Sequence, residues 1–340
     1  MDSFSQQPNS PASTSSHQQG MSLFLSAVHT FFYGEKKKAE ELFLSALKCD
    51  ETLLFAYCYL NSIYCEEKNF TKAIHICRIG MKKNPKEAYL SFCLAMTYNQ
   101  INEHERAIKL YHPYREKYPR DCECLFMLGY SYDQLGNPSR ARYYYSQIAK
   151  LHPSHHKALF NLGLLEEREK NQECAITHFE KVLQLKTDHW KASIRLAILF
   201  SRQGKLEQAI QAYKRALQIK PDLRDVHYNL SLLYRRQRAF PQAISALKEV
   251  LKQDAKDQQS WYQLALIYSE TGEIEIAIEC IKKVLSLNLF HVKAHYQLGK
   301  LYLTKGKRKK VIREIDFLER EKREYALLLR RALNWQNREA

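Results

Sequence analysis

Nine cysteines are the residues of this 340-residue chain that could most readily do chemistry. A thiolate can attack an electrophile or bind zinc, but structural zinc sites use cysteine pairs at CxxC-type spacing, and the chain has no such pair. The odd number favours free thiols, packed as small hydrophobic side chains in a reducing cytosol. We therefore predict no metal site and no cofactor. The cysteines are Cys49, Cys58, Cys65, Cys77, Cys93, Cys122, Cys124, Cys174 and Cys280.

Three histidines, His152, His155 and His156, form a second cluster of reactive side chains within one short segment. Imidazoles can bind metals, but three histidines in one inter-repeat loop favour solvent-exposed loop residues over a metal site. No nucleophile–base pair, phosphate-binding loop or ligand cluster accompanies them, and catalysis needs convergent polar groups in a closed pocket. We therefore predict that the protein is not an enzyme.

The positive charge of the chain is uneven. Of a formal net charge of +16, most lies in residues 156–340, which carry 35 Lys and Arg against 22 Asp and Glu. A basic half suits an acidic peptide, nucleic acid or an anionic surface. The run Lys305–Lys310 (KGKRKK) is compatible with phosphate binding, with a nuclear signal or with a solvated outer face. Stacking aromatics are not beside it, which argues against a nucleic-acid surface.

The elements that must position these residues follow from a strict repeat of 34 residues. Alanine recurs at one position in eight successive units. Leucine recurs at another, and the residue after it is small in every unit but one, where Asn61 stands. An aromatic residue follows three positions later, except at Glu166. The alanines are Ala39, Ala73, Ala107, Ala141, Ala175, Ala209, Ala243 and Ala277, and the leucines are Leu60, Leu94, Leu128, Leu162, Leu196, Leu230, Leu264 and Leu298.

Each unit is predicted to be two antiparallel helices, because its apolar residues recur at three- and four-residue steps. Five glycines share the mid-unit column and supply the positive φ that ends the first helix. The small residues lie where the two helices cross, since a bulky side chain there would push the backbones apart. Prolines close four units because proline ends a helix. The glycines are Gly34, Gly136, Gly204, Gly272 and Gly306.

These columns resemble the tetratricopeptide repeat (TPR) motif, W-x₂-L-G-x₂-Y…A-x₃-F…P, over nine units from residue 20 to residue 325. The resemblance implies an all-α, right-handed superhelical solenoid of about nine repeats, with degenerate first and last units. Residues 326–340 are predicted to form a capping helix and tail, because a terminal repeat must face water. Residues 1–19, rich in Ser and Gln, are expected to be disordered.

The run that begins at Met21 resembles a signal sequence, but no basic segment precedes it and the repeat register explains it. No apolar run reaches the roughly 18 residues that a membrane span needs. We expect a cytoplasmic protein, while a targeting role for the N-terminal tail and a nuclear role for residues 305–310 stay open.

In the TPR family the first helix of each unit lines a concave surface, which implies a partner-binding site here. Units one to four would present an apolar groove, able to accept an amphipathic or apolar segment. Units five to seven would present polar and basic groups that suit acidic residues. Packing of the same side chains as plain core, or against a second copy of the chain, is the alternative. The candidates are Phe55, Tyr59, Tyr89, Phe92, Met96, Phe126, Tyr130, Asn161, Lys191, Arg195, Asn229 and Arg235.

The basic candidates only partly resemble the carboxylate clamp that some family members use to bind a C-terminus. Asn161, Lys191 and Arg195 match three of its five positions, whereas Phe126 and Tyr130 occupy the other two and cannot make those contacts. The sequence thus favours a non-catalytic interaction scaffold or chaperone-like adaptor that binds another protein. The alternatives are a structural subunit of a ubiquitin-ligase-like or ciliary-type assembly that uses its convex face, and nucleic-acid binding through the basic half.

Overall fold

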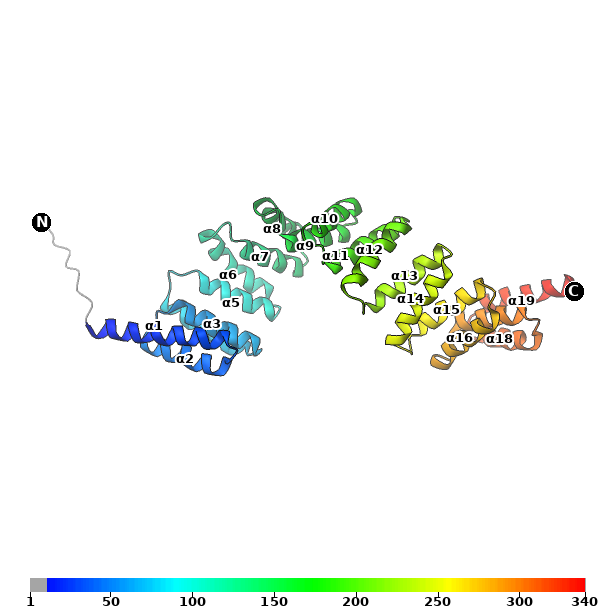
Figure 1. Cartoon of the computed structure of the whole chain (residues 1–340), viewed down its shortest axis with the longest axis horizontal. Coiled ribbons are helices and arrows are strands. Elements are labelled where there is room, and N and C mark those ends of the chain that lie inside the picture. The colour runs from blue at the N-terminus through cyan, green and yellow to red at the C-terminus, as the bar shows by residue number, and fades with distance from the viewer. Residues whose placement is uncertain (1–10, 340) are drawn as a thin grey trace. The chain divides into compact units, whose positions relative to one another are not determined.

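The structure is a computed structural model that describes the backbone of residues 11–339 and the side chains of residues 15–335. Across this range the chain forms nineteen α-helices and no strand. Eighteen of them follow one another as nine antiparallel pairs, and a single helix follows the last pair (Figure 1). The predicted all-α helical repeat solenoid is confirmed by this succession of helix pairs.

The chain divides into two compact units at the boundary between His178 and Phe179, which lies within α10 (Gln172–Leu185). The first helices of the nine pairs are α1 (Pro11–Phe32), α3 (Leu54–Glu66), α5 (Tyr89–Gln100), α7 (Cys122–Gln134), α9 (His156–Arg168), α11 (Trp190–Arg202), α13 (Arg224–Arg236), α15 (Gln258–Glu270) and α17 (Val292–Thr304). The second helices are α2 (Lys36–Cys49), α4 (Phe70–Lys83), α6 (His104–Lys117), α8 (Pro138–Leu151), α10 (Gln172–Leu185), α12 (Leu206–Ile219), α14 (Phe240–Gln253), α16 (Ile274–Leu287) and α18 (Arg308–Glu321). The closing helix is α19 (Arg323–Glu339).

In all nine repeats, the turn inside the pair places a residue with a left-handed backbone conformation (positive φ) at the same repeat position. The five glycines of the mid-unit column have φ between +65° and +85°, as the sequence predicts. The other four repeats place a residue with a side chain at the same position, with φ between +58° and +66°. These residues are Lys68, Asn102, Lys170 and Arg238. Register therefore dictates the turn, and glycine is only its least strained occupant.

Lys68→Gly is expected to stabilise the first unit by about 0.5–1 kcal/mol, because glycine removes the left-handed strain that a lysine carries there. The reciprocal change, Gly136→Lys, places a side chain at φ +69° and should destabilise by a similar amount. Urea unfolding followed by circular dichroism measures both. If both substitutions changed the free energy of unfolding in the same direction, this explanation of the turn position would be contradicted.

The small column is the place where the two helices of a pair touch. A Cβ built on Gly129 would lie 2.6 Å from Cε1 of Tyr145, a side chain with no exposed surface. In the second repeat the larger and smaller residues are distributed differently over the two repeat positions that Gly129 and Tyr145 occupy here. The larger Asn61 takes the place of a small residue in the second repeat, and there the smaller Cys77 occupies the position of Tyr145. The crossing thus keeps its combined volume while the individual residues vary.

The two exceptions in the repeat columns each have polar partners. The amide of Asn61 donates to the carbonyl of Ala73 at 3.3 Å and to Oγ1 of Thr97 at 2.8 Å. Glu166, which replaces the motif aromatic, forms an ion pair with Arg142, whose Nε lies 3.0 Å from the carboxylate, and accepts a hydrogen bond from the amide of Asn171 at 2.8 Å. Both departures from the motif therefore leave a buried polar group satisfied, and neither breaks the fold.

The expected disorder of residues 1–19 is wrong for residues 11–19, which belong to helix α1. The hydroxyl of Ser16 donates to the carbonyl of Cys49 at 2.6 Å, and His17 pairs with the carboxylate of Asp50. Gly20 lies against the end of α2, where a Cβ would come within 3.1–3.3 Å of Asp50, Ala46 and Cys49. The composition of the segment is polar, but these contacts order it. Residues 1–10 lie outside the described part of the chain.

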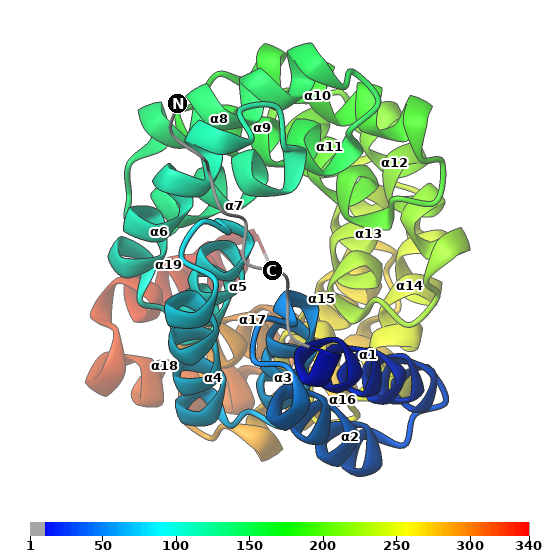
Figure 2. The same ribbon diagram turned by 90° about the vertical axis from the view of Figure 1, so that its left-hand side faces the viewer.

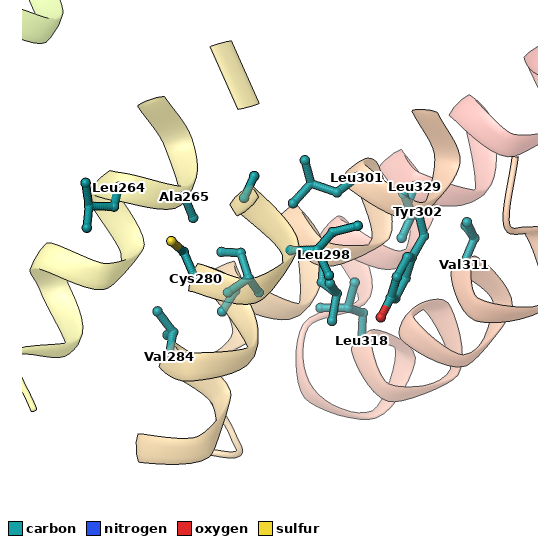
Figure 3. Packing of buried hydrophobic residues seen from close by; sticks show 14 of the residues in the cluster. Leu264, Ala265, Cys280, Val284, Leu298, Leu301, Tyr302, Val311, Leu318 and Leu329 are labelled. Carbon is teal, nitrogen blue, oxygen red and sulfur yellow. The ribbon is translucent and has the colours of Figure 1, made fainter. Parts of the chain in front are cut away.

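A continuous apolar cluster in the second unit runs from α14 to α19, and Figure 3 shows part of it. Helix α19 lies where the closing helix was predicted, and it buries Leu329 and Leu333 against the last pair. A Cβ on Gly299 of α17 would come within 2.2 Å of Leu329. The absence of a side chain at Gly299 therefore leaves room for Leu329 of the closing helix α19.

Candidate functional site

The first unit contains a cavity of about 650 Å³ on the face formed by the first helices of repeats one to four. Figure 2 shows α3, α5 and α7 on the inner side of this unit and α4, α6 and α8 on its outer side. The predicted role of the first helices in lining the inner surface agrees with this arrangement. The lining residues are Phe31, Phe55, Cys58, Tyr59, Asn61, Ser62, Cys65, Glu66, Tyr89, Phe92, Cys93, Met96, Gln100 and Glu123.

Two of the predicted partner-binding residues are aromatic side chains that the fold leaves open to solvent. Phe55 on α3 is 56% exposed and Tyr89 on α5 is 36% exposed, and their ring centroids lie 6.1 Å apart. Met96, about two turns further along α5, is half-buried in the same cavity. Exposed aromatics that contact each other at the edge of a cavity are unusual on a folded surface unless something covers them.

Two other predicted residues form the floor of the cavity instead of its rim. Tyr59 stacks on Phe43 with a centroid distance of 5.1 Å and an interplanar angle of 9°. Phe92 is only 6% exposed and packs against Tyr111 and Tyr114 at 5.6 and 4.9 Å. The floor is thus held by core packing, so the cavity keeps its shape without a ligand.

Phe126 and Tyr130, also predicted to bind a partner, do not line this cavity. Phe126 packs against Tyr145 and His155, with centroid distances of 5.6 and 5.8 Å. Tyr130 contacts the ring of His104 edge-on at 5.8 Å. Each half-buried side chain already has aromatic neighbours within the repeat array, which the sequence register alone does not reveal.

Three cysteines, Cys58, Cys65 and Cys93, add sulfur to the lining. A hydrogen bond with Cys93 and burial both raise the pKa of Cys58 far above its usual range. Burial also raises the pKa of Cys65, whose sulfur lies 3.4 Å from Oγ1 of Thr97. The thiols of Cys58 and Cys65 therefore stay protonated and behave as apolar, polarisable surface. The carboxylates of Glu66 and Glu123 lie at the margin, and Glu66 is paired with Lys36.

The predicted basic site of the second half has different properties in the structure. Asn229 and Arg235 on α13 line a polar cavity of about 500 Å³. Arg235 donates to Gln263 and to Glu270, each at 3.0 Å, and the side chain of Asn229 interacts with the hydroxyl of Tyr213. The charge of Arg235 is thus largely offset within the fold, which weakens its expected role as a carboxylate receptor.

Asn161, Lys191 and Arg195 remain the other candidates for contact with acidic residues. Asn161 belongs to α9 in the first unit, and its side chain interacts with the hydroxyl of Tyr145. Lys191 and Arg195 lie on α11 in the second unit, and the ammonium of Lys191 lies 5.5 Å from the ring centroid of Trp190. Each belongs to a first helix, as predicted, and contact of the three with a partner stays a prediction.

The histidine cluster has a structural explanation in His155. Its Nδ1 accepts a hydrogen bond from the backbone N–H of Ala158 at 3.1 Å and so caps the N-terminus of α9. His189 and His291 cap α11 and α17 in the same way, and Asp121 and Asp257 occupy this column at α7 and α15. Among the side chains that the structure describes, no group of three or more His, Cys, Asp or Glu residues is arranged to hold a metal ion. The sequence signal for this capping role was the recurrence of histidine or aspartate at one position of the 34-residue repeat.

The cap makes the stability of the first unit dependent on pH. Burial, together with the nearby charges of His156 and Lys157, lowers the pKa of His155. Only the neutral ring can accept the capping hydrogen bond. A lowered folded pKa means that the cap stabilises above the unfolded pKa of about 6.5 and is lost as the pH falls through the folded pKa. His155→Asp should keep the cap to lower pH and retain about 1 kcal/mol of stability at pH 5 relative to wild type.

The measurement is urea unfolding of both proteins at pH 7.5 and pH 5. His155→Ala is the control, because it lacks the cap at either pH. At pH 7.5 its free energy of unfolding should be lower than that of the wild type. An identical pH dependence of wild type and His155→Ala would show that the imidazole does not act as a cap.

The basic run at residues 305–310 forms the turn of the ninth pair and the first residues of α18. Lys305 pairs with Glu275, and the ammonium of Lys310 lies 5.1 Å from the ring centroid of Tyr302. These contacts agree with a solvated outer face for the run. No helix in the described part of the chain combines the length and the apolar character that a bilayer span needs.

The structure thus defines the chain as a helical repeat protein with an open apolar cavity on its inner helices. TPR family models match residues 126–189, 197–238 and 258–291. Together with the nine helix pairs at a 34-residue period, these matches identify the chain as a tetratricopeptide repeat protein. No curated protein sequence matches the chain significantly.

Solved structures share the fold at low sequence identity. The C-terminal part of a TPR repeat-containing protein from Cytophaga hutchinsonii is 13% identical, with a TM-score of 0.61, and the match covers 70% of this chain and 98% of that one. YrrB, described as a TPR protein with an unusual peptide-binding site, is 17% identical with a TM-score of 0.50, over 55% of this chain and 97% of that one. At these identities the likeness extends to the fold alone.

Proposed function

We propose that the protein is a non-catalytic interaction scaffold that binds an apolar or amphipathic segment of a partner protein in the cavity of repeats one to four. The observation that carries the proposal is the pair of solvent-open aromatics, Phe55 and Tyr89, over a floor of packed aromatics. A cavity of about 650 Å³ lies within the size range of ligand-binding clefts. A peptide-binding site described for YrrB supports the same use of the fold.

The chemistry of the lining favours an apolar side chain as the anchor. Protonated thiols, Met96 and aromatic rings provide adaptable contacts and few fixed hydrogen bonds. The two marginal carboxylates, Glu66 and Glu123, disfavour an acidic residue beside the anchor. Acidic residues of a partner would instead be contacted by Lys191 and Arg195, which both stand on α11. This role suits an adaptor or chaperone-like protein of the cytoplasm.

Selection from a random peptide library tests the proposal directly, because it lets the cavity choose its own ligand. A phage-displayed library of random 12-residue peptides is selected on the immobilised full chain, and enriched peptides are synthesised with a fluorescent label. We expect aromatic or large aliphatic residues at one or two fixed positions of the enriched set. We also expect binding to be lost when Ser62, a half-buried lining residue, is replaced by tryptophan to fill the cavity.

The matched control is Ser45→Trp, at a half-buried serine of α2 that does not line the cavity. Enriched peptides without a common apolar residue, or peptides that bind Ser62→Trp as tightly as wild type, would contradict the proposal. Thermal unfolding by circular dichroism shows whether each variant has kept its helices.

A further inference from the structure

A second apolar cavity, of about 660 Å³, lies on the outer side of the first unit, between α4 and α6 and above α5. Leu94 and Tyr98 of α5 form its buried floor, and Met81 of α4 and Leu110 of α6 form its half-buried walls. Helices α4 and α6 are the second helices of their pairs and lie on the outer side of this unit (Figure 2). The two cavities have no lining residue in common.

All the charged residues that line this outer cavity are cations. Arg78 and Lys82 stand on α4, and Arg106 and Lys109 stand on α6. Arg78 donates to the hydroxyl of Tyr98 at 3.0 Å, which holds its guanidinium at the cavity edge. Of the four, only Arg106 forms an ion pair within the described chain, with Glu103. An apolar floor between rows of cations is complementary to a ligand with an apolar face and acidic flanks.

The next repeat shows what closes such a cavity. One repeat beyond Leu110 stands Tyr144, which is 1% exposed and stacks on Tyr132 at a centroid distance of 5.6 Å. One repeat beyond Lys82 stands Glu116. Between α6 and α8, one repeat later, Tyr144 therefore fills the space that corresponds to the cavity, and Glu116 replaces the positive charge of Lys82 with a negative one. The smaller Leu110 and the lysine leave the cavity between α4 and α6 open and basic.

We propose that the outer cavity of α4, α5 and α6 is a second docking site, which binds an acidic amphipathic helix of a partner protein. Apolar side chains of that helix would cover Met81, Leu94 and Leu110, and carboxylates on its flanks would pair with Arg78, Lys82 and Lys109. An amphipathic helix presents these two features at i, i+3, i+4 and i+7 spacing. A hydrated phosphate would satisfy the cations and leave the apolar floor uncovered, and a base stack would need exposed rings where Tyr98 is buried.

The test uses the full chain and a labelled synthetic 18-residue helical peptide, with leucines on one face and glutamates on both flanks. A peptide with lysine in place of every glutamate is the sequence-matched control. Two variants change the site in different ways. Leu110→Tyr fills the cavity with the residue of the next repeat, and Lys82→Glu with Lys109→Glu reverses two exposed charges that form no ion pair within the described chain.

Lys48→Glu with Lys150→Glu is the matched control variant. Both lysines are exposed, share the repeat column of Lys82, and do not line the cavity, so the net charge changes equally. We expect the acidic peptide to bind wild type and this control alike, and to bind both cavity variants at least tenfold more weakly. Its affinity should also fall as the salt concentration rises.

Equal binding to wild type and to the charge-reversed pair, or equal binding of the lysine peptide, would overturn the proposal. If Leu110→Tyr unfolds, the charge-reversed pair decides alone. Phosphatidylserine vesicles and inositol hexakisphosphate are tested on the same variants. Binding of either one, with the same variant dependence and without binding of the acidic peptide, would assign the site to anionic headgroups and refute a protein partner. Phe55→Ala, which changes the cavity of repeats one to four (the inner groove), should leave binding of the acidic peptide unchanged. This variant therefore distinguishes binding in the outer cavity from binding in the inner groove.

Discussion

Phe55→Ala together with Tyr89→Ala is expected to weaken binding of a peptide selected on the inner groove by about a hundredfold. Both rings are open to solvent, lie 6.1 Å apart and line the same cavity. Truncation of an aromatic anchor in a binding pocket costs about 1.5–2 kcal/mol or more, so two such losses amount to roughly two orders of magnitude in Kd. Fluorescence anisotropy of the labelled peptide measures the change.

The control replaces one Phe and one Tyr that are exposed elsewhere in the same unit. Phe32 and Tyr33 are 74% and 72% exposed and do not line the cavity, so Phe32→Ala with Tyr33→Ala should bind the peptide as wild type does. Because the groove aromatics are exposed, their removal should leave the unfolding curve almost unchanged. A similar loss of affinity in both double variants would show that general surface hydrophobicity binds the peptide.

Gly129→Leu is expected to produce the largest loss of stability, about 3 kcal/mol. Even the Cβ of a new side chain would lie 2.6 Å from the Tyr145 ring, which is fully buried. Overpacking at such a contact typically costs 1–3 kcal/mol, and a leucine adds three further carbon atoms to the clash. The loss should be confined to the first unit, because both residues belong to the α7–α8 pair.

Two optical signals separate the units in this experiment. All three tryptophans, Trp190, Trp261 and Trp335, belong to the second unit, whereas circular dichroism reports helices of both. Urea unfolding of Gly129→Leu should therefore shift the circular dichroism curve more than the tryptophan fluorescence curve. Gly129→Ser with Tyr145→Leu copies the Ser231–Leu247 pair of a later repeat and should cost less than the sum of the two single changes. Simple additivity would contradict the proposed exchange of volume across the crossing.

The fold was predictable because each repeat carries the same local information nine times. Helical periodicity, the small column and the glycine column all specify one helix pair, and the structure contains nine. The positive φ at Lys68, Asn102, Lys170 and Arg238 was not predicted, since none of these residues is a glycine. Their position in the glycine column was the available signal.

The candidate site was predictable in part. Phe55, Tyr59, Tyr89, Phe92 and Met96 all line the inner cavity, because register decides which face of a first helix points inward. Register does not decide whether that face is already covered. Phe126 is covered by Tyr145 and His155 from the next helices, and such contacts depend on side-chain conformations that a repeat pattern does not encode.

The outer cavity was missed for a related reason. It depends on Leu110 being smaller than Tyr144 in a position where both residues are apolar. A column of apolar residues predicts burial equally well for either side chain. Only the volume left between α4 and α6 distinguishes a filled space from an open one.

The central claim is that the inner groove of repeats one to four holds an apolar segment of a partner, and site-specific photocrosslinking tests it most directly. Benzoylphenylalanine is placed at Tyr89, inside the groove, or at Tyr143, which is 48% exposed and does not line it. The full chain is then irradiated with a peptide selected on the wild-type protein. A crosslink from position 89 to the apolar residues of the peptide, with none from position 143, is the predicted result. Crosslinking from position 143 alone, or equally from both positions, would contradict it.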